Sequence, residues 1–184
     1  VSVEQRAKIK AMNYGLAYGL SAFGLSQQLR IDTSEARGLM DEYFETFGGV
    51  RDYLGGIVDE ARRSGFTETI LGRRRYLPDL TSDNRMRREM AERMALNAPI
   101  QGSAADIIKV AMIDVHIALR EQGSAARMLL QVHDELVFEA PDDEVDAAAQ
   151  VVKRVMEAAP GPALQLSVPL TVETGAGANW AEAH

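Results

Sequence analysis

Near its start the chain carries two cations and an aromatic ring at regular four-residue intervals. Arg6, Lys10 and Tyr14 stand at positions i, i+4 and i+8 of the segment RAKIKAMNYGLAYG. In a helix this spacing places all three on one stripe. Such a stripe suits an anionic ligand that carries a flat ring, and a nucleoside triphosphate has both properties. Solvated cations on a surface helix give the same pattern, so the spacing alone leaves both interpretations open.

A histidine and two carboxylates stand together between two apolar runs in the segment QVHDELV. The runs over residues 128–132 and 135–140 have the composition of strands, which predicts a tight hairpin turn at His133, Asp134 and Glu135. Adjacent carboxylates repel each other unless solvent or a cation separates them. A hard divalent cation such as Mg2+ takes oxygen ligands and needs only one or two protein carboxylates. The turn is therefore a candidate metal site, although a plain polar turn has the same composition.

A third group follows the helical period further along the chain. Arg93, Asn97 and Gln101 are spaced at four-residue intervals. Asn and Gln donate to the acceptors of the DNA minor groove, which are placed similarly in every base pair. Such contacts would report pairing geometry without reading sequence. The alternative is an ordinary polar helix face.

Arginines are concentrated in one part of the chain. Residues 62–93 hold nine arginines against five acids, and Arg73, Arg74 and Arg75 are consecutive. Gly72, Arg73 and Arg74 separate two short strand-like segments, residues 66–71 and 75–77, which predict a small hairpin or an extended loop. A patch that contacts phosphates and a solvated surface both fit this pattern.

The elements that must position these groups are predominantly helical. The first helix is predicted over residues 3–18, with Ile9, Met12 and Leu16 on the side that packs against a core, and Gly19 is expected to end it. Further helices are predicted over residues 32–47, 50–63, 84–98 and 103–122, with another that opens at Pro141.

Local signals set the expected ends of these helices. Gly48-Gly49 is expected to separate the helix over 32–47 from the helix over 50–63. Pro99 is expected to end the helix over 84–98, because its ring clashes with the preceding turn. The acids at 142–144 are expected to cap the helix that opens at Pro141. A last strand is predicted over residues 168–174. Two pairs have the spacing of a capping box: Asp32 with Glu35, and Ser103 with Asp106.

Composition narrows the classes that remain. The 184 residues are 46% hydrophobic and include no cysteine, which excludes a disulfide framework and thiolate metal sites and fits a reducing cytoplasm. No apolar run is long enough to span a bilayer. The net charge of −7 is uneven, since residues 1–127 carry +1 and residues 128–184 carry −8. A basic stripe for DNA is therefore compatible with an acidic protein.

Four segments together resemble the C-terminal part of bacterial DNA polymerases of the A family, and they occur in the same order and spacing as in that family. They are RAKIKAMNYGLAYG at 6–19, LGRRRYLPDL at 71–80, ERMALNAPIQGSAAD at 92–106 and QVHDELV at 131–137. The resemblance implies an α+β fold in which mainly helical fingers accompany a small antiparallel palm sheet, as an incomplete right-hand polymerase domain. It implies fingers over residues 1–80 and a palm portion over 81–184, with the metal-binding hairpin at 128–140.

The resemblance also implies roles for the first segment in binding the incoming dNTP. Arg6 and Lys10 match the residues that hold the triphosphate, and Lys10 also matches the general acid toward the departing pyrophosphate. Tyr14 matches the ring that stacks on the incoming base and sugar. Tyr18 matches the ring that occupies the templating position until the fingers close, and Gly19 follows it in the nucleotide-binding segment.

The other segments are implied to bind metal and primer–template DNA. Asp134 matches the carboxylate that binds the catalytic Mg2+ ions, and Glu135 matches its less essential neighbour. His133 matches a contact to the primer terminus. The minor-groove and phosphate contacts are implied to come from Arg93, Asn97, Gln101 and Arg73 to Arg75.

The family's other metal-binding aspartate lies in an upstream segment, D-x-S-x-I-E-x-R, and nothing in this sequence resembles it. We therefore expect a fragment that lacks half of the metal site and does not extend a primer by itself. The complete enzyme is expected to be a cytoplasmic monomer without membrane attachment, acting in DNA replication and repair. Two alternatives remain: a non-catalytic DNA-binding module built from polymerase parts, and a metal-dependent hydrolase that uses the hairpin turn.

Overall fold

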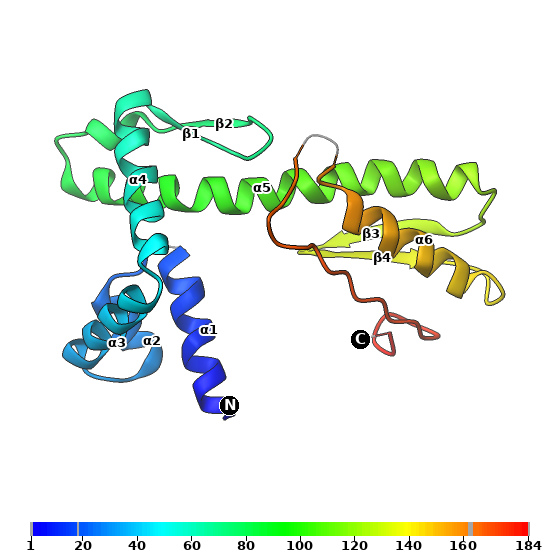
Figure 1. Ribbon diagram of the computed structural model, residues 1–184, viewed down its shortest axis with the longest axis horizontal. Coiled ribbons are helices and arrows are strands. Elements are labelled where there is room, and N and C mark those ends of the chain that lie inside the picture. Colours follow the sequence, from blue (N-terminus) through cyan, green and yellow to red (C-terminus); the bar gives the residue numbers. More distant parts are fainter. Residues whose placement is uncertain (1, 18, 162–163, 184) are drawn as a thin grey trace. The chain divides into compact units, whose positions relative to one another are not determined.

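The computed structural model describes residues 2–17, 19–161 and 164–183 (Figure 1). This part of the chain is mainly helical and contains two separate two-stranded antiparallel sheets. It divides into two compact units, Val1–Ser103 and Ala104–His184, whose boundary lies inside helix α5 (Arg85–Glu121). The predicted α+β class is confirmed, whereas the division into fingers over 1–80 and palm over 81–184 stays a prediction. No helix in the described part is long and apolar enough to cross a membrane.

The first unit begins with four helices, and the first three of them pack around a small apolar cluster. Met12, Leu25 and Ala36 are buried together, with partly buried residues such as Leu20 and Leu39 around them. The helices are α1 (Val3–Ala17), α2 (Ala22–Leu29), α3 (Thr33–Thr46) and α4 (Gly48–Ser64). The first three helices each contribute a small apolar face to this cluster, as expected for amphipathic helices of this length.

One predicted cap and one predicted helix break in this region are wrong. Asp32 precedes α3, but its side chain makes no capping hydrogen bond, so the capping box with Glu35 is not formed. The break between α3 and α4 falls at Phe47, and Gly48 and Gly49 belong to α4. The ring of Phe47 packs on Tyr43 with centroids 4.9 Å apart, so an aromatic contact lies at this joint, where the glycines were expected to set the break.

A short hairpin follows α4, as predicted, with strands of three residues each. Gly65 ends α4 with a φ of 81°, a left-handed conformation that favours glycine. Strands β1 (Phe66–Glu68) and β2 (Arg74–Tyr76) then pair antiparallel, and the short helix η1 (Pro78–Thr81) leads into α5. A second apolar cluster holds α4, η1 and the start of α5 together: Ala61, Leu77, Leu80, Ala91 and Ala95.

Helix α5 continues through Pro99, so the predicted interruption and the predicted cap at Ser103 are wrong. The loop of the β1–β2 hairpin packs onto the helix here, and the Ile70 N–H donates to Ser103 Oγ at 3.0 Å. Arg73 Nη2 donates to the Gly102 carbonyl at 3.0 Å. Proline removes one backbone hydrogen bond from a helix, and these contacts attach the hairpin loop to α5 just beyond that position.

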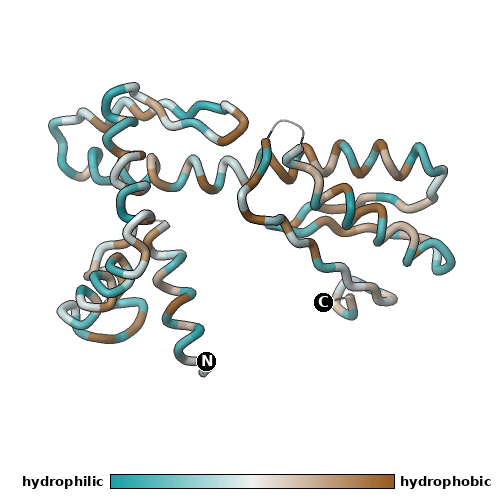
Figure 2. Tube along the Cα trace, viewed as in Figure 1, coloured by the Kyte–Doolittle hydropathy of each residue, from teal (hydrophilic) through white to brown (hydrophobic). Residues whose placement is uncertain are grey.

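The second unit packs helix α6 (Val145–Ala158) and the C-terminal part of α5 against a hairpin. Strands β3 (Arg127–Val132) and β4 (Glu135–Glu139) pair antiparallel, which confirms the predicted hairpin. Figure 2 shows that hydrophobic residues alternate with hydrophilic ones along these helices. The buried cluster consists of Val115, Leu119, Ala148, Val151 and Val152.

Two predictions for this unit are wrong. Helix α6 begins at Val145 rather than Pro141, because the Glu144 carboxylate turns away to accept bonds from Ser124 Oγ at 2.6 Å and from the Ala125 N–H at 2.9 Å. These bonds lower the pKa of Glu144, so the contact is present at neutral pH and is lost as the pH falls through that lowered pKa. Residues 168–174 form no strand in the described structure, and the Val172 N–H donates to a Glu157 carboxylate instead of to a neighbouring strand.

The packing of the hairpin loop on α5 predicts opposite effects for two Gly→Ala substitutions. A Cβ added at Gly102 would lie 2.6 Å from Thr69 Cγ2, whereas a Cβ at Gly38 within α3 would meet nothing within 4 Å. We expect Gly102→Ala to destabilise the protein by about 1–3 kcal/mol through overpacking. Gly38→Ala should instead stabilise it by up to about 1 kcal/mol, because alanine favours a helix over glycine. Thermal unfolding of the two variants beside the wild type measures both effects, and equal shifts would contradict the close packing at Gly102.

Candidate nucleotide and nucleic-acid site

Helices α1 and α5 line a cavity of about 580 Å³ within the first unit. The cavity brings together five residues that the sequence singled out from two distant segments. They are Arg6, Lys10 and Tyr14 of α1 with Asn97 and Gln101 of α5. The predicted cationic stripe and the predicted amide row therefore face one common space.

The α1 side of the cavity combines positive charge with an exposed ring. Arg6 and Lys10 are exposed, and 56% of Tyr14 is accessible to solvent. Lys10 Nζ lies 5.8 Å from the centre of the Tyr14 ring, within the range of a cation–π contact. A ligand with a negative and an aromatic part can therefore contact both groups at once.

One predicted core residue lines the cavity instead. Met12 and Leu16 are buried as expected, but Ile9 is 50% exposed. At about 100° per residue, Ile9 lies at the border between the buried face of α1 and the stripe of Arg6. Its side chain therefore adds an apolar surface to the cavity floor, as Ile100 of α5 does.

Asn13 also lines the cavity, and the predicted set of site residues omitted it. Its Oδ1 accepts a hydrogen bond from the Tyr43 hydroxyl of α3 at 2.9 Å. The signal was present in the sequence, because Asn13 follows Lys10 by three residues and so shares its side of the helix. The partner on α3 has no comparable local signal.

The end of α1 closely approaches α5 at Gly19. Gly19 has a φ of 65°, and a Cβ there would lie 2.9 Å from Leu96 Cδ1 and 3.2 Å from Arg93 Cγ. Conformation and space therefore both favour glycine at this position. Arg93 does not line the cavity but lies beside this contact. Tyr18, the other predicted nucleotide-binding residue of the segment, lies outside the described residues.

The three consecutive arginines of the hairpin have different surroundings. Arg73 donates to the Gly102 carbonyl of α5. Arg74 bonds to Glu68 Oε2 at 2.7 Å and lies over the Phe66 ring at 4.5 Å. The bond to Glu68 is the largest cause of the raised pKa of Arg74. Arg75 is exposed. The predicted phosphate-contacting role of these residues stays a prediction.

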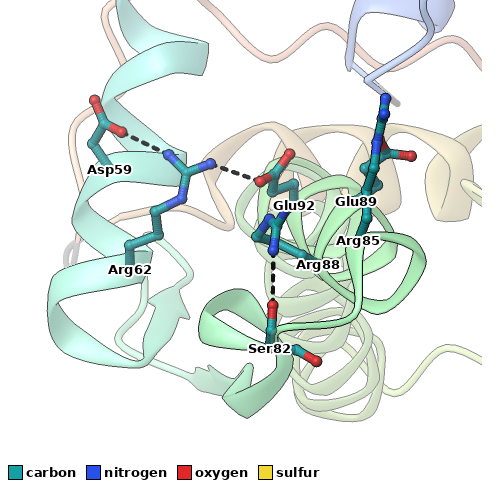
Figure 3. A network of polar contacts seen from close by, with 7 residues as sticks. All are labelled: Asp59, Arg62, Ser82, Arg85, Arg88, Glu89 and Glu92. Atoms are coloured by element: carbon teal, nitrogen blue, oxygen red, sulfur yellow. Dashed lines mark hydrogen bonds and ion pairs between the residues drawn. The ribbon is translucent and has the colours of Figure 1, made fainter.

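Other arginines of the basic segment pair with nearby acids (Figure 3). Arg62 of α4 bridges Asp59 and Glu92, with Nη1 3.0 Å from Asp59 Oδ1 and Nη2 2.6 Å from Glu92 Oε1. Arg85 pairs with Glu89 at 2.6 Å, which raises the pKa of Arg85 and lowers that of Glu89. The arginine count therefore overstates the positive charge that this segment offers to a ligand.

The second unit carries the candidate metal site at the β3–β4 turn. Asp134 is exposed and Glu135 is half-buried. His133 has a φ of 54°, an uncommon left-handed conformation for a residue with a side chain. Gln131 Nε2 donates to the His133 carbonyl at 2.6 Å and supports this turn. Hard carboxylate oxygens fit Mg2+, but no three His, Cys, Asp or Glu side chains among the described residues gather into a metal cluster.

Comparison with known proteins assigns the chain to a family. The sequence model of DNA polymerase family A matches residues 1–182. The DNA polymerase I of Mycobacterium tuberculosis is 60% identical over 185 residues, and the match covers 100% of this chain and 20% of that protein. The DNA polymerase I of Bacillus caldotenax is 50% identical over 183 residues, with the same shares of the two chains covered.

A solved structure is similar in fold as well as in sequence. The POL domain of Pol1 from M. smegmatis, in complex with DNA primer-template and dNTP, matches with a TM-score of 0.94 and 58% identity. The match covers 100% of this chain and 32% of that one. The chain belongs to DNA polymerase family A, which confirms the resemblance seen in the sequence. It spans about a fifth of the length of the curated relatives that it matches.

Proposed function

We propose that this chain is the part of a DNA polymerase I that holds the incoming dNTP and contacts the primer–template. The complete enzyme would add dNMP to a primer 3′-hydroxyl and release pyrophosphate, as a cytoplasmic monomer that acts in DNA replication and repair. The observation that carries this proposal is the cavity in which Arg6, Lys10 and Tyr14 face Asn97 and Gln101, in a chain of DNA polymerase family A. The primer-template and dNTP in the similar M. smegmatis structure support it.

In this proposal the α1 stripe binds the nucleotide from phosphates to base. Arg6 and Lys10 neutralise the triphosphate, and the Tyr14 ring stacks on the base and sugar. Phosphoryl transfer needs positioning and charge neutralisation more than covalent help, and these residue types supply both. Lys10 also donates a proton to the departing pyrophosphate. Tyr18 occupies the templating position until the fingers close, and Gly19 allows the chain to turn beside α5.

Asp134 and Glu135 are the proposed Mg2+ ligands. Mg2+ is commonly bound through one or two carboxylates with water and substrate phosphates, so the pair at the β3–β4 turn is a suitable part of such a site. When bound, Mg2+ lowers the pKa of the primer hydroxyl and stabilises the leaving oxygen. His133 contacts the primer terminus from the same turn, and its backbone conformation determines where Asp134 is presented.

The proposed DNA contacts come from α5 and from the β1–β2 hairpin. Asn97 and Gln101 donate to minor-groove acceptors, which tests the shape of the base pair rather than its identity. Arg93 extends this row by one helical turn. Arg75 contacts backbone phosphate directly, whereas Arg73 and Arg74 add positive potential while they keep their protein contacts.

The proposed metal site predicts a strong effect of removing one carboxylate. In the complete polymerase, Asp134→Ala should lower the rate of primer extension in Mg2+ by at least about 100-fold, because ligand loss weakens the metal's stabilisation of the developing charge. The exposed Asp142, just beyond the hairpin, provides a matched control, and Asp142→Ala should extend at the wild-type rate. Equal rates for Asp134→Ala and the wild type would exclude Asp134 as a metal ligand.

The tyrosine at position 14 predicts weak discrimination against dideoxynucleotides. A hydroxyl near the sugar 3′ position can stand in for the missing hydroxyl of such an analogue. Tyr14→Phe should therefore raise the preference for dNTP over ddNTP by roughly tenfold, the value of one hydrogen bond. The ratio of kcat/KM for the two nucleotides, measured on the same primer–template, tests this. An unchanged ratio would show that the Tyr14 hydroxyl does not approach the sugar.

A further inference from the structure

A hydrogen bond ties the nucleotide-binding face of α1 to a helix that does not line the cavity. The Tyr43 hydroxyl of α3 donates to Asn13 Oδ1 at 2.9 Å, across 30 positions of sequence. Asn13 lines the cavity beside Lys10 and Tyr14. The side chain that fixes the Asn13 amide therefore comes from outside the cavity.

The position of the Tyr43 hydroxyl is well determined by the packing of its ring. The ring lies 5.7 Å from that of Phe44 in an edge-on arrangement and 4.9 Å from that of Phe47. It also packs on the apolar cluster that contains Met12 of α1. Edge-on and tilted aromatic contacts prefer particular orientations, so the ring has little freedom to move its hydroxyl away from α1.

The direction of this bond determines what Asn13 offers to the cavity. A side-chain amide has one acceptor oxygen and an NH2 group with two donors. Because the Tyr43 hydroxyl donates to Oδ1, the amide is oriented with its oxygen toward α3, and the Nδ2 donors remain for the cavity. An acceptor-rich ligand such as a nucleotide would gain a donor next to the two cations of α1.

We propose that Tyr43 is a positioning residue for nucleotide binding, and this rests on the proposed function. Tyr43 holds the Asn13 amide so that its NH2 group donates to an oxygen of the incoming nucleotide. Asn13 is the residue that contacts the nucleotide, and Tyr43 acts only through it. Loss of the Tyr43 hydroxyl leaves the amide free to rotate and to present its oxygen to an anionic ligand, which weakens binding.

The test removes only the hydroxyl. In the complete polymerase, single-turnover incorporation is measured against dNTP concentration for the wild type, Tyr43→Phe and Tyr53→Phe. Tyr53 lies on α4 with an exposed ring and provides a matched loss of one hydroxyl. Tyr43→Phe should raise the Kd for dNTP by about three- to tenfold, as expected for one hydrogen bond, with less change in the maximal rate. Tyr53→Phe should leave both values unchanged.

Variants of Asn13 separate positioning from a general structural effect. Asn13→Ala should raise the Kd for dNTP, and adding Tyr43→Phe to it should cause no further rise. Asn13→Asp keeps an acceptor for Tyr43 but has no donor, so it should also weaken binding. Additive effects in the double variant, or an unchanged Kd in Tyr43→Phe, would overturn the inference. A wild-type enzyme with no saturable dNTP dependence would instead refute the proposed function.

Discussion

Burial of one narrow face of α1 is the constraint on which the candidate site depends. Met12 is 4% exposed in a cluster with Leu25 and Ala36, and full burial of a side chain of this size is worth about 1.5–3 kcal/mol. A helix is rigid about its axis, so fixing this face also fixes the direction of every other side chain on it. The stripe of Arg6 and Lys10 is then held in the cavity without having to pack against anything itself. Its charges remain available to a ligand.

The surrounding structure keeps that stripe distinctive. The protein is acidic overall, with a net charge of −7, and Arg62, Arg74 and Arg85 are paired with nearby acids. Positive charge on exposed side chains in the cavity therefore contrasts with its neighbourhood, and a low-dielectric wall such as that of Ile9 and Ile100 strengthens its effect on an anion. On α5 the hairpin loop bonds to Gly102 and Ser103, next to the amide side chains of Asn97 and Gln101 that line the cavity.

The features that could be predicted from the sequence depend on residues close together in the chain. The helical period alone placed Arg6, Lys10 and Tyr14 together, and the alternation around His133 and Asp134 gave the hairpin. Several of the errors arose where distant segments contribute to the outcome. Pro99 lies within a helix, and a hairpin about 30 residues upstream packs beside it. Residues 168–174 have strand composition but no strand beside them among the described residues, and the contribution of Tyr43 to Asn13 depends on how α3 packs against α1.

In the proposed function, the exposed stripe of α1 binds the triphosphate of a nucleotide. This binding is tested most directly by the dNTP dependence of single-turnover incorporation when Lys10 loses its charge. Lys10→Ala should raise the Kd for dNTP by at least about tenfold, because a hydrogen bond to a charged group is worth about 1.5–3 kcal/mol. Lys109→Ala, which removes an exposed charge from α5 outside the cavity, should leave that Kd unchanged. Equal Kd values for both variants and the wild type would show that Lys10 does not bind the triphosphate.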